Sequence, residues 1–190
     1  MISSFFNRTK PINYVVIIAF VVLLFLLETF LIADVTQSVM ALLPKLATLA
    51  ILVLTIFAIN PILVRNKLVE LNSLTMLFFS LLLASFLPVL QFDGLVISNF
   101  IILLSLNQVL SLKNEKRTRY KIFEAALLIF IASLFNEWAL VFLVPLFLGI
   151  YAYCPVQLRN WLMPIAAFVA VALLVTAFST LNGGLNWISD

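Results

Sequence analysis

Long apolar runs follow one another along the chain, and only short polar segments separate them. The runs predict seven helices, over residues 14–33, 39–59, 73–90, 95–112, 122–135, 139–153 and 161–181. A helix needs about 20 mostly apolar residues to cross a hydrocarbon layer of about 30 Å. The pattern therefore predicts an all-α protein, a polytopic transmembrane helical bundle of about seven spans.

Proline and glycine predict where two of these helices end or begin. Asn60-Pro61 is expected to end the second span, because proline disfavours helical backbone at the residue before it. Asp93-Gly94 is a turn signal and is expected to separate the third span from the fourth.

The composition agrees with a membrane protein. Of the 190 residues, 65% are hydrophobic and only 10% are charged, whereas about a quarter of the residues of soluble domains are charged. We expect an interfacial segment over residues 1–13, a transmembrane domain over 14–181 and a short outer tail over 182–190. With one cysteine and no histidine, the chain lacks the usual nitrogen and sulfur metal ligands, so we predict no metal site and no cofactor.

The positive residues predict how the chain is threaded, since basic residues of short loops stay on the cytoplasmic side. With a cytoplasmic N-terminus, every basic residue except Lys45 falls in the expected inner regions, and the spans form successive hairpins followed by an unpaired seventh. The densest basic strip acts as an orientation signal or binds anionic lipid headgroups. It consists of Lys113, Lys116, Arg117, Arg119 and Lys121.

The two runs over 122–135 and 139–153 are short for membrane spans, at about 21–23 Å each. They could form one interrupted span or a hairpin, and only the hairpin leaves Arg159 on the cytoplasmic side. We therefore predict a hairpin whose outer turn is Asn136, Glu137 and Trp138.

Two charged residues lie inside apolar runs. Glu28 and Lys45 are each about 9–10 Å from the first outer turn, so they are at matching depth. Because an intramembrane charge is costly unless it is paired or faces a polar cavity, we predict an ion pair that locks the first hairpin. The alternative is a relay for protons or substrate.

The fourth run carries the amides Asn99, Asn107 and Gln108, which we interpret as a helix face that forms interhelical hydrogen bonds with other protein. No catalytic site is predicted, since the chain contains no G-x-S-x-G, H-E-x-x-H, P-loop or C-x-x-C motif.

Three functions remain open on these observations. The first is a non-enzymatic accessory or scaffold subunit of a cell-envelope complex, with the lipid bilayer and other membrane subunits as partners and no nucleic acid. The second is a small transporter that uses Glu28 and Lys45. The third is an enzyme for lipid-linked substrates at the outer leaflet, with Glu137 and Asp34 as its carboxylates.

Four segments spread over nearly the whole chain carry a resemblance: MISSFFNRTKPINY, NPILVRNKLVELNS, TRYKIFEAALLIFIASLFNEW and RNWLMP. On these segments the chain resembles a multi-spanning inner-membrane protein family of unknown function from Bacteroidota. The resemblance implies a location in the inner membrane of a Gram-negative cell. Family members are longer, with further spans after the matched region, so it also implies a chain that is part of a longer protein.

Overall fold

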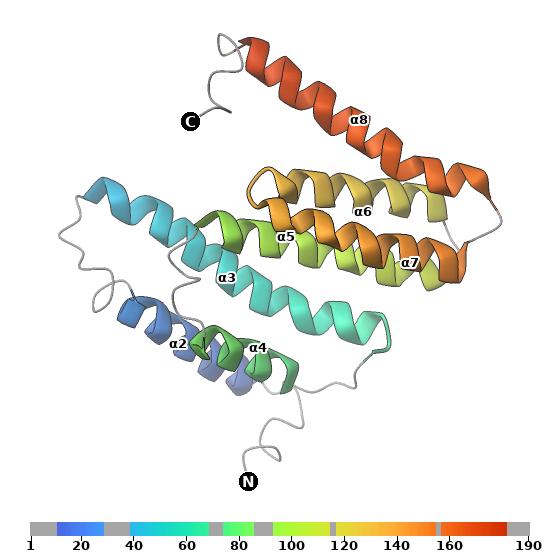
Figure 1. The fold of residues 1–190 in the computed structure, drawn as a ribbon. Helices are drawn as coiled ribbons and strands as arrows, with labels where there is room; N and C mark the ends of the chain where they lie inside the picture. The colour runs from blue at the N-terminus through green and yellow to red at the C-terminus, as the bar shows by residue number, and fades with distance from the viewer. Residues whose placement is uncertain are drawn as a thin grey trace. The chain divides into compact units, whose positions relative to one another are not determined.

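The computed structural model describes residues 11–28, 39–68, 74–85, 93–114, 117–154 and 157–181. Within these residues the chain forms seven α-helices and two short 3-10 helices and contains no strand, so the predicted all-α class is confirmed. Each α-helix falls within or overlaps one of the seven apolar runs, in the same order (Figure 1). The helices are α2 (Pro11–Leu27), α3 (Val39–Arg65), α4 (Leu74–Ser85), α5 (Asp93–Leu110), η3 (Ser111–Asn114), α6 (Thr118–Ser133), η4 (Glu137–Phe142), α7 (Leu143–Tyr153) and α8 (Leu158–Leu181).

Three helical segments of the described part are long and apolar enough to cross a membrane. They are Pro44–Arg65 in α3, Gly94–Lys113 in α5 with η3, and Leu158–Leu181 in α8. Shorter apolar helices cover Ile12–Leu27, Leu74–Ser85 and Glu137–Tyr153. Three helices are therefore candidate spans by length and composition, and the larger number of seven spans stays a prediction.

The predicted end of the second helix at Asn60-Pro61 is wrong, because α3 continues through Pro61 to Arg65. An interior proline removes one backbone hydrogen bond, and apolar helices tolerate this where neighbouring groups hold the helix in place. Here the Asn60 amide donates to the Tyr14 hydroxyl at 3.1 Å, and the rings of Tyr14 and Phe57 stack with centroids 5.6 Å apart. Contacts with α2 therefore hold α3 helical across its proline.

The helix ends instead in a Schellman motif. The amide of Leu68 donates to the Leu63 carbonyl and the amide of Lys67 donates to the Val64 carbonyl, both at 3.0 Å. Lys67 has the left-handed φ of 56° that this motif requires just past the helix end. The chain thus leaves α3 two residues after Arg65, in a segment rich in polar side chains.

The chain divides into two compact units, residues 1–103 and 104–190, with the boundary inside α5. In the first unit, α2 and α3 run antiparallel, since Tyr14 near the start of α2 contacts Asn60 near the end of α3. The core of this unit repeats every four residues along α2 and is completed by side chains of α3, α4 and the start of α5. Its buried members are Ile17, Val21, Phe25, Leu52, Ile56, Met76 and Val96.

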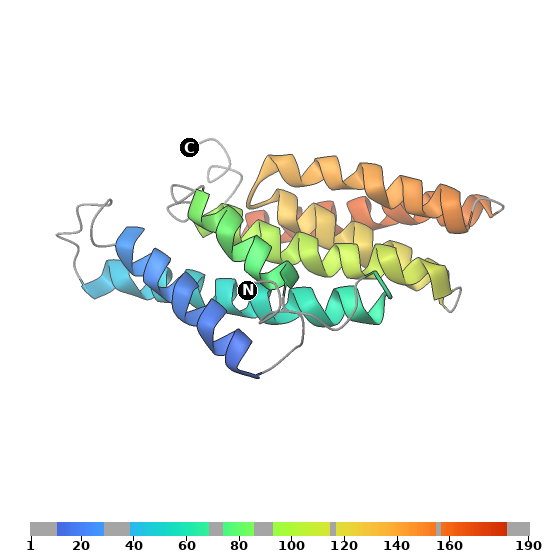
Figure 2. The same cartoon turned by 90° about the horizontal axis from the view of Figure 1, so that it is seen from below.

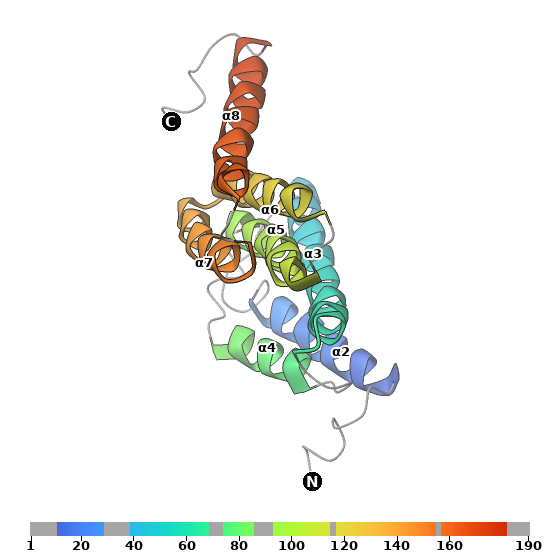
Figure 3. The same ribbon diagram turned by 90° about the vertical axis from the view of Figure 1, so that its right-hand side faces the viewer.

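The second unit is organised around α6. The Ser105 hydroxyl donates to the Ala125 carbonyl at 2.9 Å, so the second half of α5 runs antiparallel to α6. Helix α7 folds back along α6 as a hairpin (Figures 1 and 2). Helix α8 runs parallel to α6, since Arg119 contacts Gln157 at their starts and the ring of Phe130 packs edge-on against the ring of Phe168 further along. Helix α8 packs against α6, and Figure 3 shows the start of α8 beside α6.

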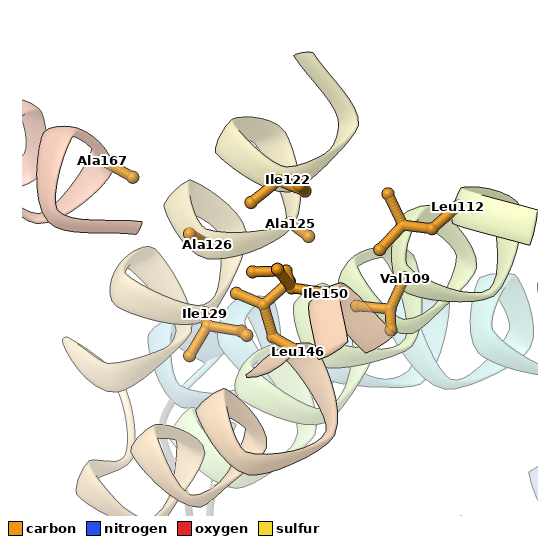
Figure 4. Close-up of a cluster of buried hydrophobic side chains, with 9 residues drawn as sticks. All are labelled: Val109, Leu112, Ile122, Ala125, Ala126, Ile129, Leu146, Ile150 and Ala167. Carbon is orange, nitrogen blue, oxygen red and sulfur yellow. The ribbon is translucent and has the colours of Figure 1, made fainter. Parts of the chain in front are cut away.

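Small side chains allow this close packing. Ala125, Ala126 and Ala132 of α6 are fully buried, as is Ala167 of α8. Around them lie branched side chains of α5, α6 and α7, which Figure 4 shows converging on one cluster. Helices in an apolar solvent associate through such close contacts, because lipid tails are as apolar as the side chains themselves. The cluster consists of Val109, Leu112, Ile122, Ala125, Ala126, Ile129, Leu146, Ile150 and Ala167.

Gly149 tests this packing directly. A Cβ atom at Gly149 would lie 3.0 Å from Val109 Cγ1 and 3.5 Å from Leu112 Cδ1, so Gly149→Leu is expected to separate α7 from α5. Overpacking of this kind lowers the free energy of unfolding by about 1–3 kcal/mol. The matched control is Ala152→Leu on the exposed side of α7, which is expected to change it by less than about 0.5 kcal/mol. Circular dichroism during titration with sodium dodecyl sulfate measures both, and equal losses would contradict the packing described.

Candidate functional site

The two predicted intramembrane charges lie near the same end of the first hairpin. Glu28 directly follows α2 and is buried, with 1% of its surface exposed. Lys45 lies in the second turn of α3 and is half-buried. Because α2 and α3 are antiparallel, the end of α2 and the start of α3 belong to the same end of the pair. The ion pair between Glu28 and Lys45 stays a prediction.

The other end of α2 and α3 carries buried polar groups that the sequence reasoning missed. Asn13 and Asn60 are 0% and 3% exposed, and Asn60 donates to Tyr14. The Asn60 Oδ1 atom has no hydrogen-bond partner among the described residues. A buried acceptor of this kind costs about 1–3 kcal/mol, so this end of the hairpin offers an acceptor to water or to a ligand. The sequence signal for these groups is Asn60 beside Pro61, a pair that also predicts a helix end.

The polar side chains of α5 do not share one face as predicted. Asn99 and Gln108 are nine residues apart, or two and a half helical turns, so they point to opposite sides of the helix. Asn99 is exposed, while Asn107 and Gln108 are half-buried. The packed face carries serines instead: Ser98 and Ser105 are buried, and Ser105 bonds across to α6. Their seven-residue spacing was the signal for this face.

The predicted outer turn joins α6 to η4. Asn136 caps η4, and its side-chain oxygen accepts a hydrogen bond from the Trp138 amide at 3.4 Å. Glu137 is exposed and Trp138 is 78% exposed, as expected for side chains at a turn. The chain thus reverses direction here and does not continue as one interrupted helix, whereas the level of this turn in a membrane stays a prediction.

The second arm of this hairpin is longer than a regular helix of the same residues. It consists of η4, with six residues, followed directly by α7, with eleven. At about 2.0 Å per residue in the 3-10 helix and 1.5 Å in the α-helix, the arm reaches about 28 Å. This length is close to the hydrocarbon thickness of about 30 Å.

An apolar groove of about 270 Å³ lies between the end of α6 and the middle of α8. Its two hydroxyl groups donate to their own helices, Ser133 to the Phe130 carbonyl at 2.8 Å and Thr176 to the Leu173 carbonyl at 3.0 Å. The groove therefore offers its surroundings apolar contact and no catalytic group. It is lined by Phe130, Ser133, Leu134, Phe168, Val171, Ala172, Val175 and Thr176.

Basic side chains of η3 and of the first turns of α6 and α8 gather at the end of the second unit where α6 and α8 begin. The Arg119 guanidinium donates to the Gln157 side chain at 3.2 Å, and the Lys121 ammonium donates to the Ser111 carbonyl at 2.6 Å. The first bond joins the start of α6 to the connection before α8, and the second joins α6 to η3, which precedes it. We call this group the basic edge: Lys113, Arg117, Arg119, Lys121 and Arg159. Lys116, which belongs to the basic strip predicted from the sequence, lies outside the described residues.

Among the described residues there is no group of three or more His, Cys, Asp or Glu side chains that could hold a metal ion. Comparison of the chain with protein-family models, curated proteins and solved structures finds no match.

A double-mutant cycle tests the predicted pair of Glu28 and Lys45. If the two charges interact, Glu28→Ala and Lys45→Ala each lower the free energy of unfolding, since each leaves the other charge without its partner. The double variant should then be no less stable than the worse single variant, with a coupling energy of about 1–3 kcal/mol. Unfolding in mixed micelles measures all four proteins, and strictly additive losses would exclude the pair.

Proposed function

We propose that this chain is a non-enzymatic, multi-pass protein of the inner membrane that serves as an accessory or scaffold subunit of a cell-envelope complex. The observation that carries this proposal is Asn99, an exposed amide on an apolar helix. It lies five residues after Gly94, or about 8 Å along a candidate span. Polar groups in hydrocarbon are stable when another helix satisfies them, so Asn99 is suited to bind a helix of a partner subunit.

Multi-pass threading is supported by the helix directions in the second unit. Helix α6 is antiparallel to α5 and to α7 and parallel to α8, as expected if consecutive helices cross in opposite directions. The basic edge lies at one end of α6, and the turn with Glu137 lies at the other. With the positive end in the cytoplasm, this arrangement favours the predicted threading with a cytoplasmic N-terminus.

The inner membrane and the larger complex are inferred from less direct observations. The sequence segments resemble an inner-membrane family, and the apolar groove between α6 and α8 provides no catalytic group. Large apolar side chains are exposed along α8, which suits contact with lipid. Leu173, Leu174, Phe178 and Leu181 are each at least 60% exposed.

A small permease is the second candidate, favoured by the buried carboxyl group of Glu28 at the end of α2. Ionisable groups inside a bundle often belong to proton or substrate pathways. A permease of this kind should function as an isolated protein, whereas an accessory subunit needs its complex. Proton uptake by proteoliposomes that disappears in Glu28→Gln would favour the permease.

Photocrosslinking from position 99 tests the scaffold function. A photoreactive residue at Asn99 is expected to capture a different membrane polypeptide in whole cells, while the same residue at the exposed Leu173 should capture no discrete protein. Loss of one interhelical hydrogen bond of about 1 kcal/mol should also reduce co-purification of that polypeptide about fivefold in Asn99→Leu, with less effect in Asn99→Gln. A crosslink from position 99 to this same chain would contradict the proposal.

Single cysteines at positions 137 and 159 test the threading. In a Cys154→Ala background, a membrane-impermeant maleimide is expected to label Glu137→Cys in spheroplasts and Arg159→Cys only in inverted vesicles. Gel shift measures the labelling, and the labelling of a known periplasmic protein controls for intact spheroplasts. Labelling of both positions from the same side would exclude a hairpin that crosses the membrane.

A further inference from the structure

The basic edge brings together charges that are distant in the sequence. Arg119 stands at the start of α6, and Arg159 stands at the start of α8, two residues after the Gln157 side chain that Arg119 contacts at 3.2 Å. Lys113 and Arg117 flank the connection between α5 and α6, and both are exposed. Folding of the second unit thus gathers charges from η3, α6 and α8 into one surface.

The net charge of this surface is set by its side chains and not by the helix dipoles. Helices α5 and α7 end here and helices α6 and α8 begin here, so their dipoles largely offset one another. The acidic side chains described in this unit are Glu124 and Glu137, and Glu137 lies at the opposite end of α6. Among the described residues, Glu124, which is half-buried and one turn after Tyr120, is the acidic side chain nearest to the five cations, and Glu115 in the connection before α6 lies outside the described residues.

Aromatic and apolar side chains lie between these cations. Tyr120 stands between Arg119 and Lys121 and is 64% exposed, while Tyr153 at the end of α7 is 46% exposed. Leu158, next to Arg159, is 79% exposed. Tyrosine and exposed leucine beside arginine and lysine are typical of residues at the boundary between headgroups and acyl chains.

We propose that the basic edge binds the phosphate headgroup of an anionic phospholipid, of the phosphatidylglycerol class. Arginine presents a planar fork of donors that matches phosphate oxygens, and Arg119 and Arg159 supply two such forks from two helices. Tyr120, Tyr153 and Leu158 contact the glycerol region and the first part of the acyl chains. The inference rests on the proposed placement in a membrane, and it is independent of any partner subunit.

Native mass spectrometry of the purified full chain tests the proposal. The protein is reconstituted in nanodiscs with equal amounts of dioleoyl-phosphatidylglycerol and dioleoyl-phosphatidylcholine, and the lipids that it retains on release are counted. The wild-type protein is expected to retain phosphatidylglycerol preferentially. Each cation near an anionic surface contributes about 1 kcal/mol of binding free energy, which corresponds to about fivefold in affinity. Arg159→Gln should therefore reduce this preference about fivefold, and the double variant with Arg119→Gln should reduce it further.

Matched variants distinguish binding at the basic edge from a general effect of positive charge on lipid retention. Arg65→Gln removes an exposed cation at the end of α3 and is expected to leave the preference unchanged. The double variant Arg119→Lys, Arg159→Lys should retain only part of the preference, because lysine keeps the charge but lacks the planar fork. Circular dichroism of each variant shows whether it is folded, and Arg159→Gln alone affects a single exposed side chain.

Three outcomes would overturn the proposal. The first is equal retention of the two lipids by the wild-type protein, and the second is an unchanged preference in the Arg119→Gln, Arg159→Gln variant. The third is a preference that Arg65→Gln reduces as much as Arg159→Gln does, which would show that general positive charge selects the lipid instead of this site. Failure of the protein to insert into nanodiscs would instead contradict the placement in a membrane, so the two failures are distinguishable.

Discussion

Close contact at small side chains of α6 is the interaction on which the second unit depends. Ala125 and Ala126 are fully buried, and they lie in the cluster that α5, α7 and α8 complete. In an apolar surrounding, helices gain little from leaving the solvent, so contact distance and complementary shape determine whether they associate. The position of the basic edge follows from this packing, because its residues lie in η3 and in the first turns of α6 and α8.

Local features of the sequence were sufficient to predict the helices. Apolar runs and the polar residues between them gave all seven in the correct order, and the charge of Arg159 favoured the hairpin of α6 and α7 that the structure contains. The basic strip was also visible as a run of charges. Such features are read from neighbouring residues, and helix formation in an apolar segment depends mainly on neighbouring residues.

Features that depend on distant residues could not be predicted in this way. Pro61 suggested a helix end, but the contact of Asn60 with Tyr14, 46 residues away, holds α3 helical past it. The amides of α5 suggested a packed face, although Ser105 makes the hydrogen bond to α6. The bond between Arg119 and Gln157, which completes the basic edge, likewise joins residues that only the packing of α8 on α6 brings together.

The 3-10 helix η4 lengthens one arm of the hairpin. Its six residues rise about 12 Å, compared with about 9 Å for six residues of α-helix. The difference of about 3 Å is similar to the difference in hydrocarbon thickness between two cellular membranes. A change of winding in six residues thus alters the reach of an arm by that amount without any added residue, while the α7 residues that pack against α6 keep their regular helical spacing.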